Sequence, residues 1–257
     1  MNREKLTFRF PFRLDYLILT CLLWGCADRI PATFAPYEAV DLNDSILMGE
    51  YAGKIANLLV IMDTSSTMNE PYLYEAFDSN TIPSMFDVEK EVVKRLNQAI
   101  PAIDMNAGIR TYGFGPCHSW SFSMTRLKLG PYRKDTFNEA IDSIECASGG
   151  SPLDYAIETA TEDLEPVSGN TAVIIISDGE IADDAFAAAF EMKKEIGKGM
   201  CIHTISLGNG PDNRSAMRRL ASLSRCGYTT TAEELATSSG MADFVEKVFL
   251  RSKKTHH

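Results

Sequence analysis

The sequence lacks the patterns that identify several common classes of protein. Its 257 residues contain no internal repeat and no low-complexity tract, which excludes a repeat architecture and a long region of biased composition. Its six cysteines include no C-x2-C pair, so the usual ligand spacing of a structural zinc site is missing. No run of about 20 apolar residues is present, and a membrane-spanning helix needs a run of roughly that length.

Patterns typical of catalytic sites are missing too. There is no G-x-x-x-x-G-K-[ST] loop to bind phosphate. The first predicted strand ends in D-x-S rather than in the D-x-D of aspartyl-phosphate hydrolases. Basic residues are outnumbered, 25 to 35, and the formal net charge of −10 argues against nucleic acid and anionic lipid as main partners.

What the sequence has is three separated fragments rich in oxygen ligands. One is D-T-S-S-T directly after an apolar run at 56–62, another is G-G-S-P-L at 149–153, and the third is D-G directly after an apolar run at 171–177. Mg2+ prefers an octahedral array of oxygen ligands and keeps some of its waters. Together the fragments predict one Mg2+ or Mn2+ site with one position open. The predicted ligands are Asp63, Ser65, Thr67, Ser151 and Asp178.

Taken singly, each fragment has an ordinary structural interpretation. D-x-S-x-[ST] is common in turns and at helix N-termini, and G-G-S-P-L is typical of a helix start. The order of the fragments and their placement after strands favour a metal site. The alternative is a degenerate site on an intact fold.

At these residues the chain resembles the von Willebrand factor type A (VWA) domain, whose metal-ion-dependent adhesion site combines D-x-S-x-S, a distant Thr and a distant Asp. The resemblance covers about residues 54–250, and it implies that an Asp or Glu of a partner protein supplies the last metal ligand. The sequence departs from the family at Ser66 for Gly, at Thr67 for Ser and at Ser151 for Thr. The two hydroxyl exchanges keep an oxygen ligand, whereas Ser66 is expected to strain the turn or weaken the metal site.

Apolar runs alternate with amphipathic segments along the rest of the chain, which predicts a mostly parallel sheet buried on both faces. The expected fold is α/β: a doubly wound, Rossmann-like sheet of six strands, with one antiparallel edge strand and helices on both faces. The edge strand is expected at 121–129, where Arg126 and Lys128 supply the charge typical of an edge. The other strands are predicted at 56–62, 107–114, 171–177, 201–207 and 227–231, and helices at 87–100 with Asp87 as N-cap, 136–146, 152–164, 182–198, 211–224 and 233–250.

The first 26 residues have the pattern of a bacterial lipoprotein signal. Basic residues precede a short apolar stretch at 16–24, and the sequence L-W-G-C then places Cys26 where the acylated cysteine lies. Cleavage near Cys21 and plain secretion are the alternatives. Ala27 after the acylated cysteine favours the outer membrane, facing the periplasm or the surface.

These features divide the chain into four parts. Residues 1–25 are expected to form the signal peptide, and 26–53 a flexible tether. Residues 54–250 form the expected VWA domain, and 251–257 a basic, solvated tail.

Four cysteines follow the lipid-bearing one: Cys117, Cys146, Cys201 and Cys226. An even number in an oxidising compartment favours disulfides, with three pairings possible. The expected strand order favours Cys201 with Cys226, which leaves Cys117 with Cys146, and each bond would contribute roughly 3 to 4 kcal/mol. Four buried thiols are the alternative.

Two loops need separate interpretation. Residues 69–86 are longer than the usual strand-to-helix link and are rich in aromatic and acidic residues. This loop is either a recognition surface beside the metal or a variable insertion whose aromatics pack on the domain. In the predicted hairpin, His118 and Trp120 are expected to be a partly exposed pair rather than metal ligands.

The expected function is that of a lipid-tethered binding module, not an enzyme. Its Mg2+ or Mn2+ site would engage an acidic side chain of a partner protein, with cell-wall-associated proteins as candidates. One alternative is an envelope scaffold with a vestigial metal site. The other is a metal-dependent hydrolase, which the absence of a histidine from the three fragments disfavours.

Overall fold

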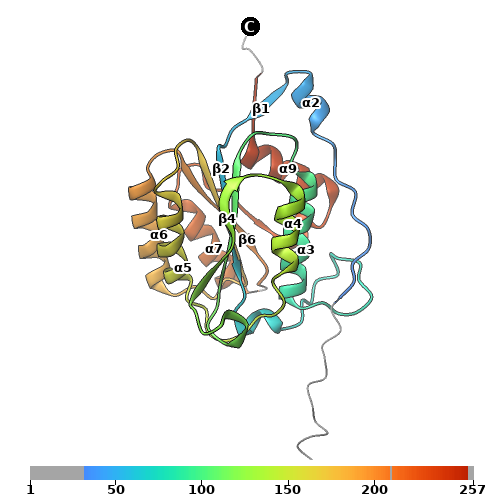
Figure 1. Ribbon diagram of the computed structural model, residues 1–257. Coiled ribbons are helices and arrows are strands. Elements are labelled where there is room, and N and C mark those ends of the chain that lie inside the picture. The colour runs from blue at the N-terminus through green and yellow to red at the C-terminus, as the bar shows by residue number, and fades with distance from the viewer. Residues whose placement is uncertain (1–31, 209, 254–257) are drawn as a thin grey trace, which may run out of the picture. The chain divides into compact units, whose positions relative to one another are not determined.

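The computed structural model describes residues 32–208 and 210–253. The predicted signal peptide and the lipid-bearing Cys26 lie outside these residues. The described chain forms a six-stranded sheet in the order β4-β3-β2-β5-β6-β7, with helices on both faces (Figure 1). Only the β3–β4 pair within this sheet is antiparallel, so the predicted fold, including its antiparallel edge strand, is confirmed.

The central strands form where the sequence has apolar runs. Every residue of β2 (Asn57–Asp63), β5 (Thr171–Ser177) and β6 (Met200–Ser206) is buried, as expected for parallel strands covered by helices on both faces. On one side of them lie β3 (Asn106–Tyr112) and the edge strand β4 (Ser123–Pro131), and on the other the short β7 (Thr229–Thr231).

Two helical layers cover the sheet. One core contains apolar residues of α3 (Met85–Ala99), α4 (Lys134–Asp142), α8 (Ala232–Leu235) and α9 (Ser238–Phe249). The opposite core contains residues of α5 (Leu153–Leu164), α6 (Asp183–Ile196) and α7 (Pro211–Ser222). Two single-turn 3-10 helices, η1 (Ser66–Asn69) and η2 (Pro116–His118), follow β2 and β3.

The predicted helix at 136–146 begins and ends earlier, as α4, and two other helix boundaries differ from the prediction because of capping. Helix α3 begins after Ser84, whose hydroxyl accepts from the backbone N–H of Asp87 while the Asp87 carboxylate accepts from the backbone N–H of Ser84. Asp87 is therefore the third residue of a capping box and not the N-cap. The predicted closing helix is two helices, because the Thr237 side chain accepts from the N–H of Gly240 and starts α9 anew.

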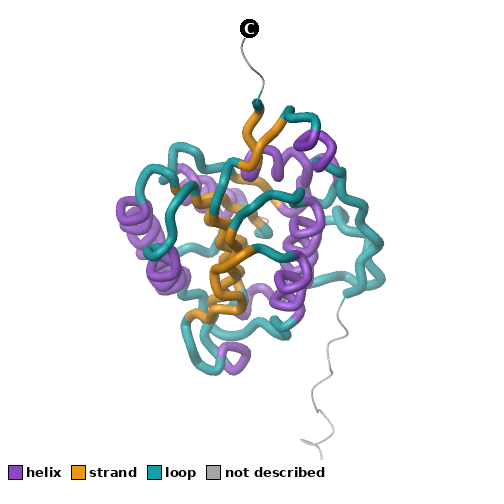
Figure 2. The backbone as a smooth tube through the Cα atoms, turned by 45° about the horizontal axis from the view of Figure 1, so that its top comes forward, coloured by secondary structure: helices purple, strands orange, loops and turns teal. Residues whose placement is uncertain are grey.

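Residues 32–53, predicted as a flexible tether, pack on the domain instead. Leu42 is buried in the core, and the side chain of Asn43, in the short helix α2 (Asn43–Leu47), accepts from the N–H of Ala102. Strand β1 (Tyr51–Gly53) pairs antiparallel with β8 (Leu250–Ser252) in a separate two-stranded sheet near the C-terminal end (Figure 2). The predicted tail thus begins inside a strand.

The cysteine pairing follows the predicted one: disulfides join Cys117 to Cys146 and Cys201 to Cys226. Of the long loop at 69–86, Tyr72 and Phe77 are buried in the core, as expected of an insertion that packs its aromatics. Among the described residues, no helix is both long and apolar enough to cross a membrane.

Candidate metal centre

The first predicted ligand, Asp63, is fully buried at the carboxyl end of β2. One carboxylate oxygen, Oδ1, accepts from the backbone N–H of Ser65 at 2.9 Å. The other, Oδ2, accepts from the hydroxyls of Tyr112 at 2.8 Å and Ser177 at 2.9 Å. These donors fix the orientation of the carboxylate, because each comes from a different segment at the same edge of the sheet.

Asp178 lies at the same edge, directly after β5. It is nearly fully buried, and its Oδ1 accepts from the N–H of Glu180 at 3.0 Å. Ser177 links the two aspartates, because its hydroxyl bonds Asp63 Oδ2 and lies 3.4 Å from Asp178 Oδ1. Parallel strands that are neighbours in the sheet thus bring two carboxylates together from positions far apart in the sequence.

The hydroxyls of Ser65 and Thr67 are close to each other, with 3.1 Å between Oγ and Oγ1. Two neighbouring ligands of an octahedral Mg2+, each about 2.1 Å from the ion, lie about 3.0 Å apart. The separation in this structure therefore fits two adjacent positions of one ion. Both hydroxyls come from the turn that begins at the buried Asp63.

The loop that carries Ser151 is attached to the same turn through the backbone. The N–H of Ser66 donates to the carbonyl of Gly149 at 2.9 Å, and the N–H of Ser148 donates to that of Thr64 at 2.8 Å. Gly149 has a φ of 76°, and a Cβ there would lie 1.3 Å from the carbonyl oxygen of Phe114. Only glycine permits this close approach, which places the exposed Ser151 beside the turn.

The strain expected at Ser66 is not present. Ser66 opens the 3-10 helix η1, and in the described chain the only non-glycine residues with positive φ are Ser119 and Trp120. Serine therefore adopts the required backbone at position 66 without left-handed strain.

The buried carboxylates shape the electrostatics of the site. Burial, and after it the negative charge of Asp178, raises the pKa of Asp63 to about 6 even though Ser65 and Tyr112 donate hydrogen bonds to it. Beneath the turn, Glu89 is fully buried, and its Oε1 accepts from the N–H of Asp63 at 2.9 Å. Burial and the charge of Asp63 hold the pKa of Glu89 well above its ordinary value.

His118 supports the turn from the other side. Its ring is buried, in contrast to the partly exposed position predicted, and Nε2 contacts the Thr64 hydroxyl, which itself donates to the carbonyl of Tyr112. Burial and the charge of Arg126 lower the pKa of His118 to about 4. The histidine is thus a neutral donor that packs the hairpin against the turn, and Trp120 alone of the predicted pair is exposed.

Three residues around Asp63 were not among the predicted site residues: Tyr112, Ser177 and Glu89. Each had a signal in the sequence. Tyr112 ends the strand beside β2, Ser177 precedes Asp178, and Glu89 interrupts the apolar face of a predicted helix. Among the described residues no cluster of three or more His, Cys, Asp or Glu side chains could hold a metal, so any metal here depends on the hydroxyl ligands.

Comparison with known proteins supports the same fold. The family model described as "von Willebrand factor type A domain" matches residues 90–229. The BatB protein of Bacteroides thetaiotaomicron is 16% identical with a TM-score of 0.56, over 75% of this chain and 96% of that one. An aerotolerance-related membrane protein of Bacteroides fragilis has the same identity and TM-score, over 75% of this chain and 100% of that one.

A pilus protein has a similar structure. The von Willebrand factor domain of the type V pili tip protein Mfa5 from Porphyromonas gingivalis is 10% identical with a TM-score of 0.54, over 76% of this chain and 95% of that one. At these identities the likeness concerns the fold. A search of curated protein sequences finds no match.

Proposed function

The chain belongs to the von Willebrand factor type A domain family, and from this we propose that it is an adhesion module whose Mg2+ or Mn2+ site binds an acidic side chain of a partner protein. The ion would be held by Asp63, Ser65, Thr67, Ser151 and Asp178. The observation that carries the proposal is the 3.1 Å separation of the Ser65 and Thr67 hydroxyls, which suits two adjacent ligands of one octahedral ion.

The donor set explains why such an ion would bind a carboxylate. Three of the five ligands are neutral hydroxyls, so only Asp63 and Asp178 would oppose the two positive charges of the ion, and no third anion would compete with a carboxylate of the partner. When bound, the ion would act as a Lewis acid with one position for an oxygen of the partner. Without it, an approaching carboxylate would meet the negative charges of Asp178 and the exposed Glu180. Binding should therefore depend on the metal.

The geometry favours binding over catalysis. The carboxylate of Asp63 is occupied by three hydrogen-bond donors, and the nearby His118 ring is fully buried. A general base needs access to a proton of the substrate. We infer that neither group has this role.

We further propose a location in the bacterial cell envelope, attached to the outer membrane by a lipid on Cys26. The lipoprotein pattern of the sequence supports this proposal. The fold is also found in an aerotolerance-related membrane protein and in a pilus tip protein. Labelling of the expressed protein with a radioactive fatty acid, lost in Cys26→Ser, tests the anchor.

Thermal unfolding in EDTA, Mg2+ or Mn2+ tests the metal site. A ligand at 100 times its Kd stabilises the folded state by about 2.7 kcal/mol, which in a domain of this size raises Tm by roughly 5 to 11 °C. We expect this shift in the wild-type protein and not in Thr67→Val, which removes one ligand without leaving a buried charge. Thr159→Val is the matched control, since its hydroxyl bonds only backbone carbonyls within α5. An equal response of all three proteins to the metals would refute the site.

A further inference from the structure

Four aromatic side chains form an exposed cluster at one end of the domain, here called the aromatic patch: Phe114, Trp120, Phe122 and Tyr155. They are 37%, 66%, 45% and 43% exposed, respectively. Their rings are in contact in series, with centroid distances of 5.7 Å for Phe114–Trp120, 4.7 Å for Phe114–Phe122 and 5.4 Å for Phe122–Tyr155. A contiguous exposed apolar surface of this kind is typical of an interaction site.

The backbone that presents the patch is strained and anchored. Ser119 and Trp120 have φ values of 48° and 61°, a region that bulky side chains rarely adopt. The disulfide of Cys117 and the buried ring of His118 hold the preceding residues. Such strain persists where the surrounding structure imposes it, and it concentrates at functional sites.

The patch adjoins the proposed metal site. The backbone of Phe114 forms bridges with Gly149 and Gly150, and the carbonyl of Gly149 accepts from the N–H of Ser66 in the metal-binding turn. The loop that carries Ser151 therefore lies between the patch and the other metal ligands. One partner could contact both sites.

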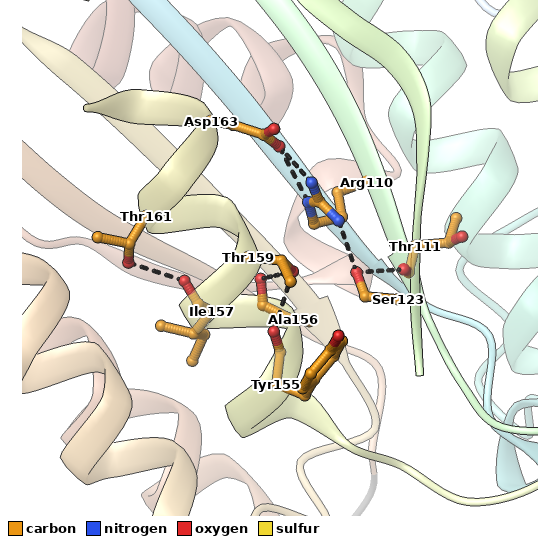
Figure 3. A network of polar contacts seen from close by, with 9 residues as sticks. All are labelled: Arg110, Thr111, Ser123, Tyr155, Ala156, Ile157, Thr159, Thr161 and Asp163. Carbon is orange, nitrogen blue, oxygen red and sulfur yellow. Dashed lines mark hydrogen bonds and ion pairs between the residues drawn. The ribbon is translucent and has the colours of Figure 1, made fainter. Parts of the chain in front are cut away.

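An ion pair with a buried arginine and a partly exposed aspartate fixes the helix that carries Tyr155. Arg110 of β3 is nearly fully buried, and its guanidinium donates to Asp163 of α5 at 2.6 and 3.0 Å and to Ser123 of β4 at 3.0 Å. Figure 3 shows this network further along the same helix from Tyr155. These contacts join α5 to the hairpin, so they hold together the two separate segments from which the rings of the patch come.

The side of the patch away from the hairpin is acidic. Asp154 and Glu158 flank Tyr155 along α5, and both line a groove between α5 and α6. Among the described residues that line the groove none is basic, although Glu191 pairs with Lys194 beside it. Its other carboxylates are Glu162, Glu165, Asp184, Glu191 and Glu195.

We propose that the aromatic patch is the second half of the partner-binding surface, and that it binds an extended segment of a partner protein. In that segment, an Asp or Glu reaches the metal, an apolar side chain packs on the aromatic rings, and a neighbouring Lys or Arg pairs with Asp154 and Glu158. The inference rests on the proposed adhesion function, since the metal defines one end of the segment. The charges lining the groove set the order of the three contacts.

The same charges argue against two other occupants. A second copy of this chain would place acidic helices against each other, in a protein whose net charge is already −10. An anionic membrane surface would be repelled in the same way. A basic, partly apolar peptide segment is the complement of this surface.

Selection from a phage-displayed library of random 12-residue peptides, on the immobilised protein in Mn2+, tests the proposal. We expect the selected peptides to share an acidic, an apolar and a basic residue, with the apolar residue between the other two in the peptide sequence. The most enriched peptide is then synthesised with a fluorophore, and its Kd is measured by anisotropy.

Two variants remove patch rings with little risk to folding. Trp120→Asn introduces a residue that tolerates the left-handed backbone, and Tyr155→Gln introduces a good helix former. Each should raise the Kd of the peptide roughly tenfold or more, as expected for aromatic residues at the centre of an interface. Phe190→Gln, at an exposed phenylalanine on α6, is the matched control and should change Kd less than about twofold. All three variants should keep the metal-induced rise in Tm.

The outcomes separate this inference from the adhesion function. Peptides that EDTA releases but that bind Trp120→Asn and Tyr155→Gln as tightly as the wild type would overturn the patch and leave the metal function standing. Peptides that bind equally in EDTA would overturn the metal function, and with it the two-part surface. Failure to select any peptide would also overturn the inference. So would a dimer, or binding to neutral phosphatidylcholine vesicles, that depends on Trp120.

Discussion

The substitution Glu89→Gln tests how the protein maintains a buried carboxyl group beneath the turn that carries Asp63, Ser65 and Thr67. Glu89 Oε1 accepts a hydrogen bond from the N–H of Asp63, and the side-chain carbonyl of glutamine can accept the same bond. Glu89 Oε2 is buried and has no hydrogen-bond partner among the described residues. An ionised carboxylate in that position would be poorly solvated, whereas an amide or a protonated carboxyl is neutral.

The raised pKa of Glu89 gives the sign of the effect. Above the pKa of the unfolded chain, the unfolded state loses this proton while the folded state still holds it. The folded state then binds more protons, so the free energy of unfolding decreases as pH rises from the ordinary pKa of glutamate to the raised one. The slope for one group is at most about 1.4 kcal/mol per pH unit.

Glutamine does not titrate, so Glu89→Gln removes this decrease. In EDTA, the two proteins should be similar in stability near pH 4.5, and the variant should gain up to about 1.4 kcal/mol on the wild type for each further pH unit. For a domain of this size the gain corresponds to roughly 3 to 6 °C in Tm per unit. The contribution of Asp63 is present in both proteins and cancels to first order.

Urea denaturation between pH 4.5 and 8 measures the difference. Glu195→Gln, at an exposed position on α6, is the control and should show a difference from wild type that hardly varies with pH. If Glu89→Gln were less stable than the wild type by a constant amount, or if its disadvantage grew with pH, the carboxyl would be ionised in the folded state and the reasoning would be refuted.

Three further substitutions test contacts that hold the domain together. Gly149→Ala should lower the free energy of unfolding by more than about 2 kcal/mol and abolish the rise in Tm with metal. Gly197 has a similar φ but open space around it, so Gly197→Ala should cost only about 1 kcal/mol. Urea denaturation of the two variants measures the difference. Asp163→Ala should cost about 2 kcal/mol, because it leaves the buried guanidinium of Figure 3 without its carboxylate. Replacing Cys201 and Cys226 together with serine should lower the free energy of unfolding by about 3 kcal/mol. Reductant should then lower Tm less than in the wild type, since Cys117–Cys146 remains but Cys201–Cys226 is gone.

Much of the fold could be predicted because the central strands have unambiguous signals. The strand at 171–177 was predicted with its observed bounds, since a run of β-branched residues between a turn and an aspartate fits a strand buried on both faces. The predicted disulfide pairs followed from the order of the strands. In each case a local pattern and the long-range topology point to the same arrangement.

The remainder depends on contacts that no local pattern encodes. Glu89 interrupts the apolar face of a helix, which signals burial, but its contact with the backbone of Asp63 depends on the packing of α3 beneath β2. The break before α9 depends on one threonine side chain within a continuous helical pattern. Residues 32–53 have little sequence periodicity, since scattered contacts rather than one apolar face hold them on the domain. One such contact is the hydrogen bond from the hydroxyl of Ser238 to the carbonyl of Glu38.

A single loop contact connects the two proposed binding features, the metal site and the aromatic patch. The carbonyl of Gly149 accepts from the N–H of Ser66 in the turn with the proposed metal ligands, and the Gly149 backbone also forms a bridge with Phe114 of the aromatic patch. The disulfide of Cys117 and Cys146 closes the hairpin and this loop within a few residues of that contact. Because these segments are already ordered, a partner that reached both the metal and the aromatic rings would lose little free energy to ordering the protein side of the interface. The position of Gly149, more than any single ligand, is therefore what would allow two weak contacts to act on one partner.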